Sequence, residues 1–354
     1  MKHPLGRRAA TLAAASTAGL FACGGDAVIA PPATLASVSF DTLFAIGAEQ
    51  GEPWQRFGGI WDVEAAADGH FAVLDLEVPA VRVYDAAGAY VSSIEATGLD
   101  EGALDRPNGL AWAGSGDLLV WDPGSSWISR FSVGGTSVTF VERSMAFAFG
   151  ETGFCASGDR TYLSYWQDGN VVHEIQADGA ARSFGPAPSV VGAETLGPEL
   201  QEIAIEELTP SGLLCTADGV LDVSFMQSLI RYHDHDGVQL WAHDLTDFTP
   251  IVAYTPDGMG LGRAFDESQG SHLLRSVVPW GTGMALVQHE LRTREVPAEG
   301  EVEVIESRLI RLSDGAELDR TRNLPLILAA QGRRLYLVSK APFPQVLVVE
   351  LAEE

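Results

Sequence analysis

The chain has 354 residues, of which 46% are hydrophobic and 20% charged, the composition of a globular protein with a substantial core. Its 22 Lys and Arg residues stand against 48 Asp and Glu residues, giving a formal net charge of −26 at pH 7. Such an acidic surface repels phosphate groups, which argues against nucleic acids and anionic lipid headgroups as partners. The length suits either two ordinary domains or one large all-β domain.

Residues 1–22 have the features of a signal peptide. A basic start is followed by a short apolar run that ends in Leu20-Phe21-Ala22-Cys23. These four residues resemble a bacterial lipobox, which implies that Cys23 is lipidated and becomes the first residue of the mature protein. The alternative is an ordinary secretory signal cleaved near Ala22, with Cys23 as an unmodified thiol.

Residues 23–36 are rich in Gly and Pro and show no periodicity, so we interpret them as a flexible tether. After residue 22 the sequence has no run of about 18 apolar residues, so the lipid is the expected membrane anchor. Gly24 is not the usual inner-membrane retention signal of the lipoproteins that the lipobox resembles. We therefore expect a protein of the cell envelope, anchored in the outer membrane and facing the periplasm.

A repeat begins after the first globular segment. The stretch GHFAVLDLEVPAVRVYDAAGAYVSSI from Gly69 aligns with GDLLVWDPGSSWISRFSVGGTSVTFV from Gly116 at an offset of 47 residues. Each copy has an apolar strand ending in Asp, a short loop, an alternating strand ending in an aromatic residue, a Gly turn and another strand. Alternation with a period of two between turn residues is typical of β-strands.

Weaker copies follow at 160–184, 219–245 and 283–318, and an incomplete sixth copy ends the chain. The expected turn glycines are Gly88, Gly135, Gly179, Gly237 and Gly315. The sixth copy lacks a strand that residues 38–47 could supply, and such closure leaves no sheet edge open. The sequence therefore predicts an all-β, six-bladed β-propeller over residues 37–354 whose N-terminal strand completes the last blade. Residues 198–208 are the one segment that could form a short helix, with a blade strand as the alternative.

The pattern RPNGLAW, G-x-LLVWD, ISRF and Gly in residues 106–135 resembles bacterial six-bladed propellers of the NHL and TolB-like kind, including lipoproteins. The likeness covers residues 38–351 and rests on scaffold motifs. Trp61-Asp62 and Trp121-Asp122 occupy different places in their repeats, so we do not interpret them as WD-repeat signatures.

RPNGLAW also resembles, more weakly, the gluconolactonase and senescence-marker propellers, in which an Asn at the position of Asn108 binds a catalytic divalent metal. Phe57 stands where that family has a metal-binding Glu, and the later Asp of the family has no counterpart. We therefore expect no catalytic residues, no metal ligands and no cofactor. The alternative is a metal-dependent hydrolase or lactonase with Ca²⁺ or another divalent cation in the central channel.

The segment YHDHDG, 232–237, carries two histidines, and His243 follows nearby. A hairpin turn at 236–237 places His243 opposite Ile230, too far from His233 to share a metal. We expect an ordinary solvated outer strand there. Cys155 and Cys215 fall at similar depths in two presumed innermost strands, where we favour buried thiols over a disulfide.

Propellers bind ligands at the channel mouth. This mouth is lined by the loops between second and third strands and by the connections between blades. The candidate ligand-binding residues are Glu77, Asn108, Asp122, Trp166, Asp168, Gln227, Arg263, His289 and Lys340. The connections 97–108, 186–210 and 246–272 are longer than a propeller needs, and long loops often carry function. We expect a non-catalytic, monomeric binding or scaffolding protein whose partner is another protein, a small molecule or a glycan.

Overall fold

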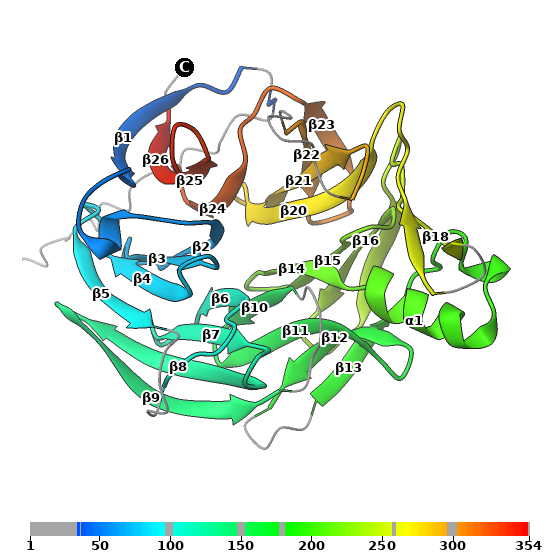
Figure 1. Cartoon of the computed structure of the whole chain (residues 1–354), viewed down its shortest axis with the longest axis horizontal. Coiled ribbons are helices and arrows are strands. Elements are labelled where there is room, and N and C mark those ends of the chain that lie inside the picture. Colours follow the sequence, from blue (N-terminus) through cyan, green and yellow to red (C-terminus); the bar gives the residue numbers. More distant parts are fainter. Residues whose placement is uncertain are drawn as a thin grey trace, which may run out of the picture.

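The computed structural model describes residues 34–35, 37–95, 102–146, 153–176, 181–256, 260–295 and 303–352. Within these ranges, six four-stranded antiparallel sheets stand around a common axis, and one edge strand of each sheet borders that axis (Figure 1). The predicted six-bladed β-propeller is therefore confirmed. Cys23 and the expected signal peptide lie outside the described residues.

The first five blades follow one another along the chain, and each begins with its innermost strand. Blade 1 contains β2 (Ile60–Ala65), β3 (Phe71–Asp75), β4 (Ala80–Tyr84) and β5 (Tyr90–Glu95). Blade 2 contains β6 (Gly109–Trp112), β7 (Leu118–Asp122), β8 (Trp127–Gly134) and β9 (Ser137–Met145). Blade 3 contains β10 (Phe154–Ser157), β11 (Arg160–Gln167), β12 (Asn170–Ile175) and β13 (Ala181–Pro186). Blade 4 contains β14 (Ser211–Cys215), β15 (Gly219–Ser224), β16 (Leu229–Asp234) and β17 (Gln239–Asp244). Blade 5 contains β20 (Ser271–Pro279), β21 (Met284–Arg292), β22 (Ile305–Arg311) and β23 (Glu317–Thr321).

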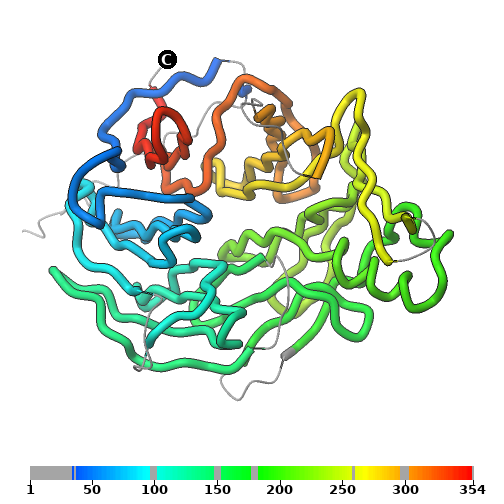
Figure 2. The backbone as a smooth tube through the Cα atoms, in the orientation of Figure 1, coloured from blue at the N-terminus to red at the C-terminus, as the bar shows by residue number. Residues whose placement is uncertain are grey.

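Blade 6 closes the ring with strands from both ends of the described chain. It contains β24 (Ile327–Gln331), β25 (Arg334–Ser339) and β26 (Gln345–Leu351), and β1 (Phe40–Ile46) is its outermost strand. β1 runs antiparallel to β26 from the pair Phe40 and Leu351 to the pair Ile46 and Val346, which places the first and last strands side by side (Figure 2). The predicted closure is confirmed, and it removes the open sheet edge that each end would otherwise present.

Neighbouring blades pack through their faces, and the alternating strands of the repeat supply the apolar side chains. At the closure, Phe71 of blade 1 stacks on Tyr84 at 5.2 Å between ring centroids and lies 5.0 Å from Tyr336 of blade 6. All three side chains are fully buried, and each contributes about 2 kcal/mol or more by its removal from water. Gly88 has a φ of +83°, and a Cβ there would lie 2.5 Å from Phe44 of β1, so a side chain would push the closing strand away.

Two insertions on either side of blade 4 form a small lobe beside the disc (Figure 1). The first contains α1 (Pro198–Leu208), and the second contains the hairpin of β18 (Val252–Tyr254) and β19 (Gly262–Ala264). Ala204 and Leu208 of α1 share an apolar cluster with Ile251 and Ala253, so the lobe has its own core. Residues 198–208 therefore form a helix of 11 residues rather than a strand, begun by Pro198 at its first turn. No helix in the described part of the chain is long and apolar enough to cross a bilayer.

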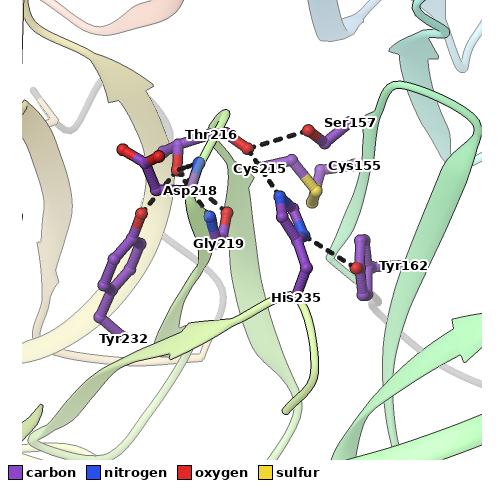
Figure 3. The surroundings of a disulfide bond; sticks show 9 residues. All are labelled: Cys155, Ser157, Tyr162, Cys215, Thr216, Asp218, Gly219, Tyr232 and His235. Atoms are coloured by element: carbon purple, nitrogen blue, oxygen red, sulfur yellow. Dashed lines mark hydrogen bonds between the residues drawn. A yellow bond between two sulfur atoms is a disulfide. The ribbon is translucent and has the colours of Figure 1, made fainter. Parts of the chain in front are cut away.

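A disulfide joins Cys155 of β10 to Cys215 of β14 and so links the innermost strands of blades 3 and 4 (Figure 3). The preference for two unbonded thiols was wrong. That preference assumed that innermost strands diverge around the channel, whereas here their Cα atoms are 5.6 Å apart, within the usual range for a disulfide. The ring nitrogens of His235 contact the Tyr162 hydroxyl and the Thr216 carbonyl beside the bond.

Candidate functional site

A cavity of about 660 Å³ opens along the axis of the disc, and residues of all six blades line it. The lining comes mainly from the first residues of the innermost strands β2, β6, β10, β14, β20 and β24. The turns after β3 and β25 add further side chains, so the cavity reaches the end of the disc where second and third strands are joined. Its volume is in the range of pockets that hold small molecules.

The Asp that ends the second strand of each clear repeat shapes the loops around this cavity. Asp75 is fully buried and accepts hydrogen bonds from the backbone N–H groups of Gly58 and Gly59, each at 2.9 Å, and from the Arg82 guanidinium at 3.0 Å. Burial raises the pKa of Asp75, but these hydrogen bonds outweigh it and hold the pKa below its ordinary value. Gly58 and Gly59 line the cavity, so this repeated Asp fixes part of its wall.

Trp61 and Asn108 join the walls of blades 1 and 2. The indole N–H of Trp61 donates to the Asn108 side-chain oxygen at 2.8 Å and to the Asn108 backbone carbonyl at 3.0 Å. Both residues line the cavity, and the Trp61 side chain remains 39% exposed. The hydrogen bond fixes the orientation of the indole and uses one of the two lone pairs of the amide oxygen that a metal would need.

Two carboxylates, Asp62 and Glu64, lie on the same wall. They are two residues apart on β2, so their side chains point to the same face of blade 1, and both line the cavity. Burial raises the pKa of Asp62 to about 6, although its carboxylate accepts a hydrogen bond from the Leu110 N–H at 2.9 Å. Burial and the nearby Asp62 charge raise the pKa of Glu64 well above its ordinary value.

The part of the cavity wall that blades 5 and 6 form carries basic side chains that already have acidic partners. Arg275 contacts Glu290 at 2.5 Å, and Arg292 contacts the same carboxylate at 3.0 Å. Lys340 pairs with Glu303. Burial raises the pKa of Glu290, but the hydrogen bond from Arg292 and the charge of Arg275 outweigh it, so the net shift is downward. The positive charges of this part of the wall are therefore largely balanced by neighbouring carboxylates.

The predicted ligand-binding residues divide into two groups. Glu77, Asn108 and Lys340 line the cavity, and they come from blade 1, blade 2 and blade 6. The other six lie outside the lining: Asp122, Trp166, Asp168, Gln227, Arg263 and His289.

Several residues of the second group have structural contacts instead. Asp122 is fully buried and accepts hydrogen bonds from the backbone N–H groups of Asp105 and Arg106, as the equivalent Asp75 does in blade 1. Trp166 is half-buried near the end of β11, and Asp168 forms the exposed turn after β11 with a φ of +50°.

Arg263 belongs to the lobe, and Gln227 of blade 4 contacts it. The Gln227 side-chain N–H donates to the Ile251 carbonyl at 3.2 Å and so attaches the lobe to blade 4. Arg263 of β19 pairs with Glu207 of α1 at 3.1 Å, which holds the two insertions together. The most irregular long connection therefore builds a separate lobe, and none of residues 256 and 260–268 lines the axial cavity.

His289 lies in a buried polar cluster of blade 5, next to Phe248 and His272. His272 accepts a hydrogen bond from the Thr249 N–H and contacts Glu306 at 3.2 Å, and Arg308 contacts the same carboxylate at 2.5 Å. Burial lowers the pKa of His289 well below its ordinary value, and the charges of His272 and Arg308 act in the same direction. His289 is therefore a neutral imidazole inside the blade.

The histidines of YHDHDG and His243 do not form a cluster. His243 lies opposite Ile230, which confirms the predicted register. The expectation of a solvated outer strand was wrong, because β17 forms the outer edge and His233 of β16 is only 1% exposed. Its ring lies 5.0 Å from that of Phe184 in blade 3. Among the described residues, no group of three or more His, Cys, Asp or Glu side chains is placed to hold a metal ion.

The sequence reasoning missed most of the lining, including the charged or aromatic side chains of Trp61, Asp62, Glu64, Arg275 and Arg292. A signal for two of them was present. Asp62 and Glu64 alternate with the apolar Val63 and Ala65, and such a pair of acidic residues at a period of two on an innermost strand is a signal for a polar patch near the channel. The repeat alignment began at the second strand of each blade and so did not compare innermost strands.

No protein-family profile matches the sequence, and no curated protein is significantly similar to it. Among solved structures, the chain is similar to a protein of Bacteroides fragilis assigned to export, with a TM-score of 0.59, 9% identity, and coverage of 89% of this chain and 95% of that one. It is also similar to a member of the DUF4221 family from Bacteroides vulgatus, with a TM-score of 0.51, 8% identity and coverage of 89% and 98%. Virginiamycin B lyase from Staphylococcus aureus gives a TM-score of 0.50, 8% identity and coverage of 89% and 100%. At such identities the likeness concerns the fold alone, and the chain shares its propeller fold with these bacterial proteins.

Proposed function

We propose that this chain is an exported, lipid-anchored propeller that binds a small molecule in its axial cavity without transforming it. The observation that carries the proposal is the cavity itself: about 660 Å³, open to one end of the disc, and lined from six blades by charged, aromatic and apolar side chains. A concave site with a few convergent polar groups is the usual form of a small-molecule site.

Export is supported by two features of the chain. The disulfide between Cys155 and Cys215 is of a kind that persists in oxidising compartments such as the periplasm. The proposed signal peptide of residues 1–22 would direct the chain to the cell envelope, and lipidation of Cys23 would anchor it, with the outer membrane as the proposed location. The similar protein of Bacteroides fragilis is also assigned to export.

Binding is favoured over metal-dependent hydrolysis by the contacts of Asn108. Its amide oxygen, which the lactonase reading would assign to a metal, accepts the Trp61 indole N–H at 2.8 Å. A hydrolytic site of that kind needs several oxygen ligands that converge on one ion. The carboxylates that line the cavity, Asp62, Glu64 and Glu77, all belong to a single blade, blade 1.

The proposed protein acts as a monomer with a small-molecule or glycan ligand. The formal net charge of −26 disfavours nucleic acids and anionic membranes as partners, since both would be repelled. The lipid at Cys23 would then provide the membrane attachment.

A matched pair of variants tests the cavity as the binding site. Leu76 and Val78 lie in the same turn and are exposed by 39% and 49%, but only Leu76 lines the cavity. The purified full chain is titrated with a panel of sugars, cell-wall fragments, amines and lactones, and each compound is recovered and analysed after incubation. We expect at least one compound to bind unchanged, with affinity lowered by Leu76→Trp and kept by Val78→Trp. Equal affinities in both variants, or conversion of a bound lactone, would contradict the proposal.

A further inference from the structure

The half-buried acidic wall of the axial cavity differs from the arginine-paired carboxylates described above. Asp75 pairs with Arg82 at 3.0 Å, and Glu290 and Glu306 pair with arginines at 2.5 Å. Asp62 and Glu64 form no ion pair with any described residue, and both lie on the side of blade 1 that faces the cavity. Asp122, which has no arginine partner among the described residues, accepts several backbone N–H groups instead. Within the same part of the chain, Asp62 and Glu64 have neither an arginine partner nor such a set of N–H donors.

An unpaired carboxylate away from bulk water is unfavourable, and two of them side by side are more so. The raised pKa values of Asp62 and Glu64 express this cost, which the backbone N–H of Leu110 only partly offsets. A cation placed in the cavity would remove the cost by pairing with the ionised forms. Binding of a positive group next to these two carboxylates should therefore be favourable.

The neighbouring indole indicates what kind of cation fits. Trp61 adjoins Asp62 on β2, lines the cavity and is 39% exposed. Its N–H is already bonded to Asn108, so what it offers a ligand is the face of its ring. The face of an indole attracts ammonium and guanidinium groups and also covers the apolar carbons attached to them.

The rest of the cavity disfavours an anion. The remaining charged side chains among its described lining are Glu77, Arg275, Arg292 and Lys340, and no histidine is among them. Arg275 and Arg292 share Glu290, and Lys340 pairs with Glu303, so the three basic groups contact two acidic partners. The acidic groups Asp62 and Glu64 have no basic partner among the described residues, and the imbalance favours a positive ligand.

We infer that the axial cavity binds an organic cation, with an ammonium or guanidinium group held by Asp62 and Glu64 and the adjoining carbons against Trp61. The inference rests on the proposed function of the cavity and adds the chemical class of its ligand. A simple amine or guanidine with an apolar or aromatic body has the required features.

The test is isothermal titration of the full chain with benzylamine, agmatine and spermidine, beside benzyl alcohol and benzoate as a neutral and an anionic match for benzylamine. We expect at least one cation to bind, and benzyl alcohol and benzoate to bind at least about tenfold more weakly than the cations that do. Asp62→Asn and Glu64→Gln should each weaken the cation by about tenfold or more, because a charge-assisted hydrogen bond is lost. Glu95→Gln removes an exposed carboxylate outside the lining and should leave the affinity unchanged.

The pH supplies a second readout that a purely structural role of the two acids would not produce. Cation affinity should rise from about pH 5 to about pH 8 in the parent chain, and this rise should shrink in Asp62→Asn. Circular dichroism and melting temperature establish that each variant is folded. Both substitutions preserve side-chain size, and the amide oxygen of Asn can still accept the Leu110 N–H.

The outcomes separate this inference from the proposed function. Binding of benzyl alcohol or benzoate that Leu76→Trp abolishes and Asp62→Asn does not would overturn the cation assignment and leave the cavity as a binding site. Binding of Ca²⁺, lost in Asp62→Asn, with no binding of the three organic cations would replace the inference by a metal site. No binding of any of the three organic cations would also overturn it.

Discussion

Trp61 donates its indole N–H to the side-chain oxygen of Asn108 at 2.8 Å, and this bond links the innermost strand of blade 1 to the residue that precedes the innermost strand of blade 2. The two residues are 47 positions apart, the same spacing as the repeat that relates the first two blades. The contact therefore connects the two copies of the repeat at the cavity wall.

Replacement of Trp61 by Phe should remove this link while keeping a ring at the wall. The expected loss in free energy of unfolding is about 1 kcal/mol, the net value of one hydrogen bond. Urea denaturation followed by fluorescence measures it, with Trp127→Phe as the control because Trp127 packs under Arg143 at 4.6 Å on the outer part of blade 2. A loss in Trp127→Phe as large as that in Trp61→Phe would contradict the assigned role of the hydrogen bond.

Asp62→Asn should stabilise the chain at neutral pH. The folded-state pKa of Asp62 is about 6 against an ordinary value of 3.8, so between these values the folded chain holds a proton that the unfolded chain has released. The free energy of unfolding therefore falls as pH rises through this window, and Asn avoids the fall. The full shift corresponds to about 3 kcal/mol. Partial exposure of Asp62 and its interaction with Glu64 reduce the expected gain to about 1 to 2 kcal/mol above pH 6.

The gain should disappear near pH 4, where Asp62 is protonated in the folded chain and the two proteins carry the same charge at this position. Melting temperatures across the range from about pH 4 to about pH 8 measure the difference. A variant that is equally stabilised at all pH values, or destabilised at neutral pH, would show that Asp62 is not an uncompensated carboxylate.

Removal of the disulfide should destabilise the propeller. Cys155 and Cys215 are separated by 60 residues, and the chain-entropy relation for a loop of that length gives about 4 kcal/mol as an upper value. The double substitution Cys155→Ala and Cys215→Ala should lower the free energy of unfolding by about 2 to 4 kcal/mol in urea denaturation. Dithiothreitol should have a similar effect on the parent chain and none on the double variant. Sensitivity of the double variant to the reductant would refute this explanation.

The buried pair of Arg308 and Glu306 should be far more important for stability than a surface pair. The Arg308 side chain is 0% exposed and contacts Glu306 at 2.5 Å, whereas Arg311 and Asp314 are exposed by 46% and 52%. Arg308→Met should cost about 3 to 5 kcal/mol because it leaves a buried carboxylate with fewer partners. Arg311→Met should cost less than about 1 kcal/mol. Similar losses in the two variants, measured by urea denaturation, would disagree with the burial of this cluster.

The repeat could be predicted from sequence because apolar and polar residues alternate with a period of two between turn residues in each copy. Asp75 and Asp122 recur since each must accept the N–H groups of the connection that precedes its blade. Closure by β1 could be predicted because the last blade lacked a strand and Phe40–Ile46 was available to complete it. Both inferences depend on local patterns within one blade.

The cavity could not be predicted in the same way because its side chains come from blades far apart in the sequence. Arg275 is the extra residue of a β-bulge in β20, which no local pattern marked. Which residues of other blades share the cavity with Asp62 follows only from the closed ring. The disulfide was missed for a related reason: how closely innermost strands approach each other depends on the curvature of the whole ring. The sequence showed that the connections around blade 4 are unusually long. It did not show that α1 packs near Ile251 and gives these insertions a core of their own.

A crystal structure of the full chain with the tightest-binding of benzylamine, agmatine and spermidine tests the central claim most directly. The account predicts the positively charged nitrogen within about 3 Å of carboxylate oxygens of Asp62 and Glu64, and the adjoining carbons on the ring of Trp61. A cation bound to the acidic outer surface or to the lobe, with no ligand in the axial cavity, would contradict it.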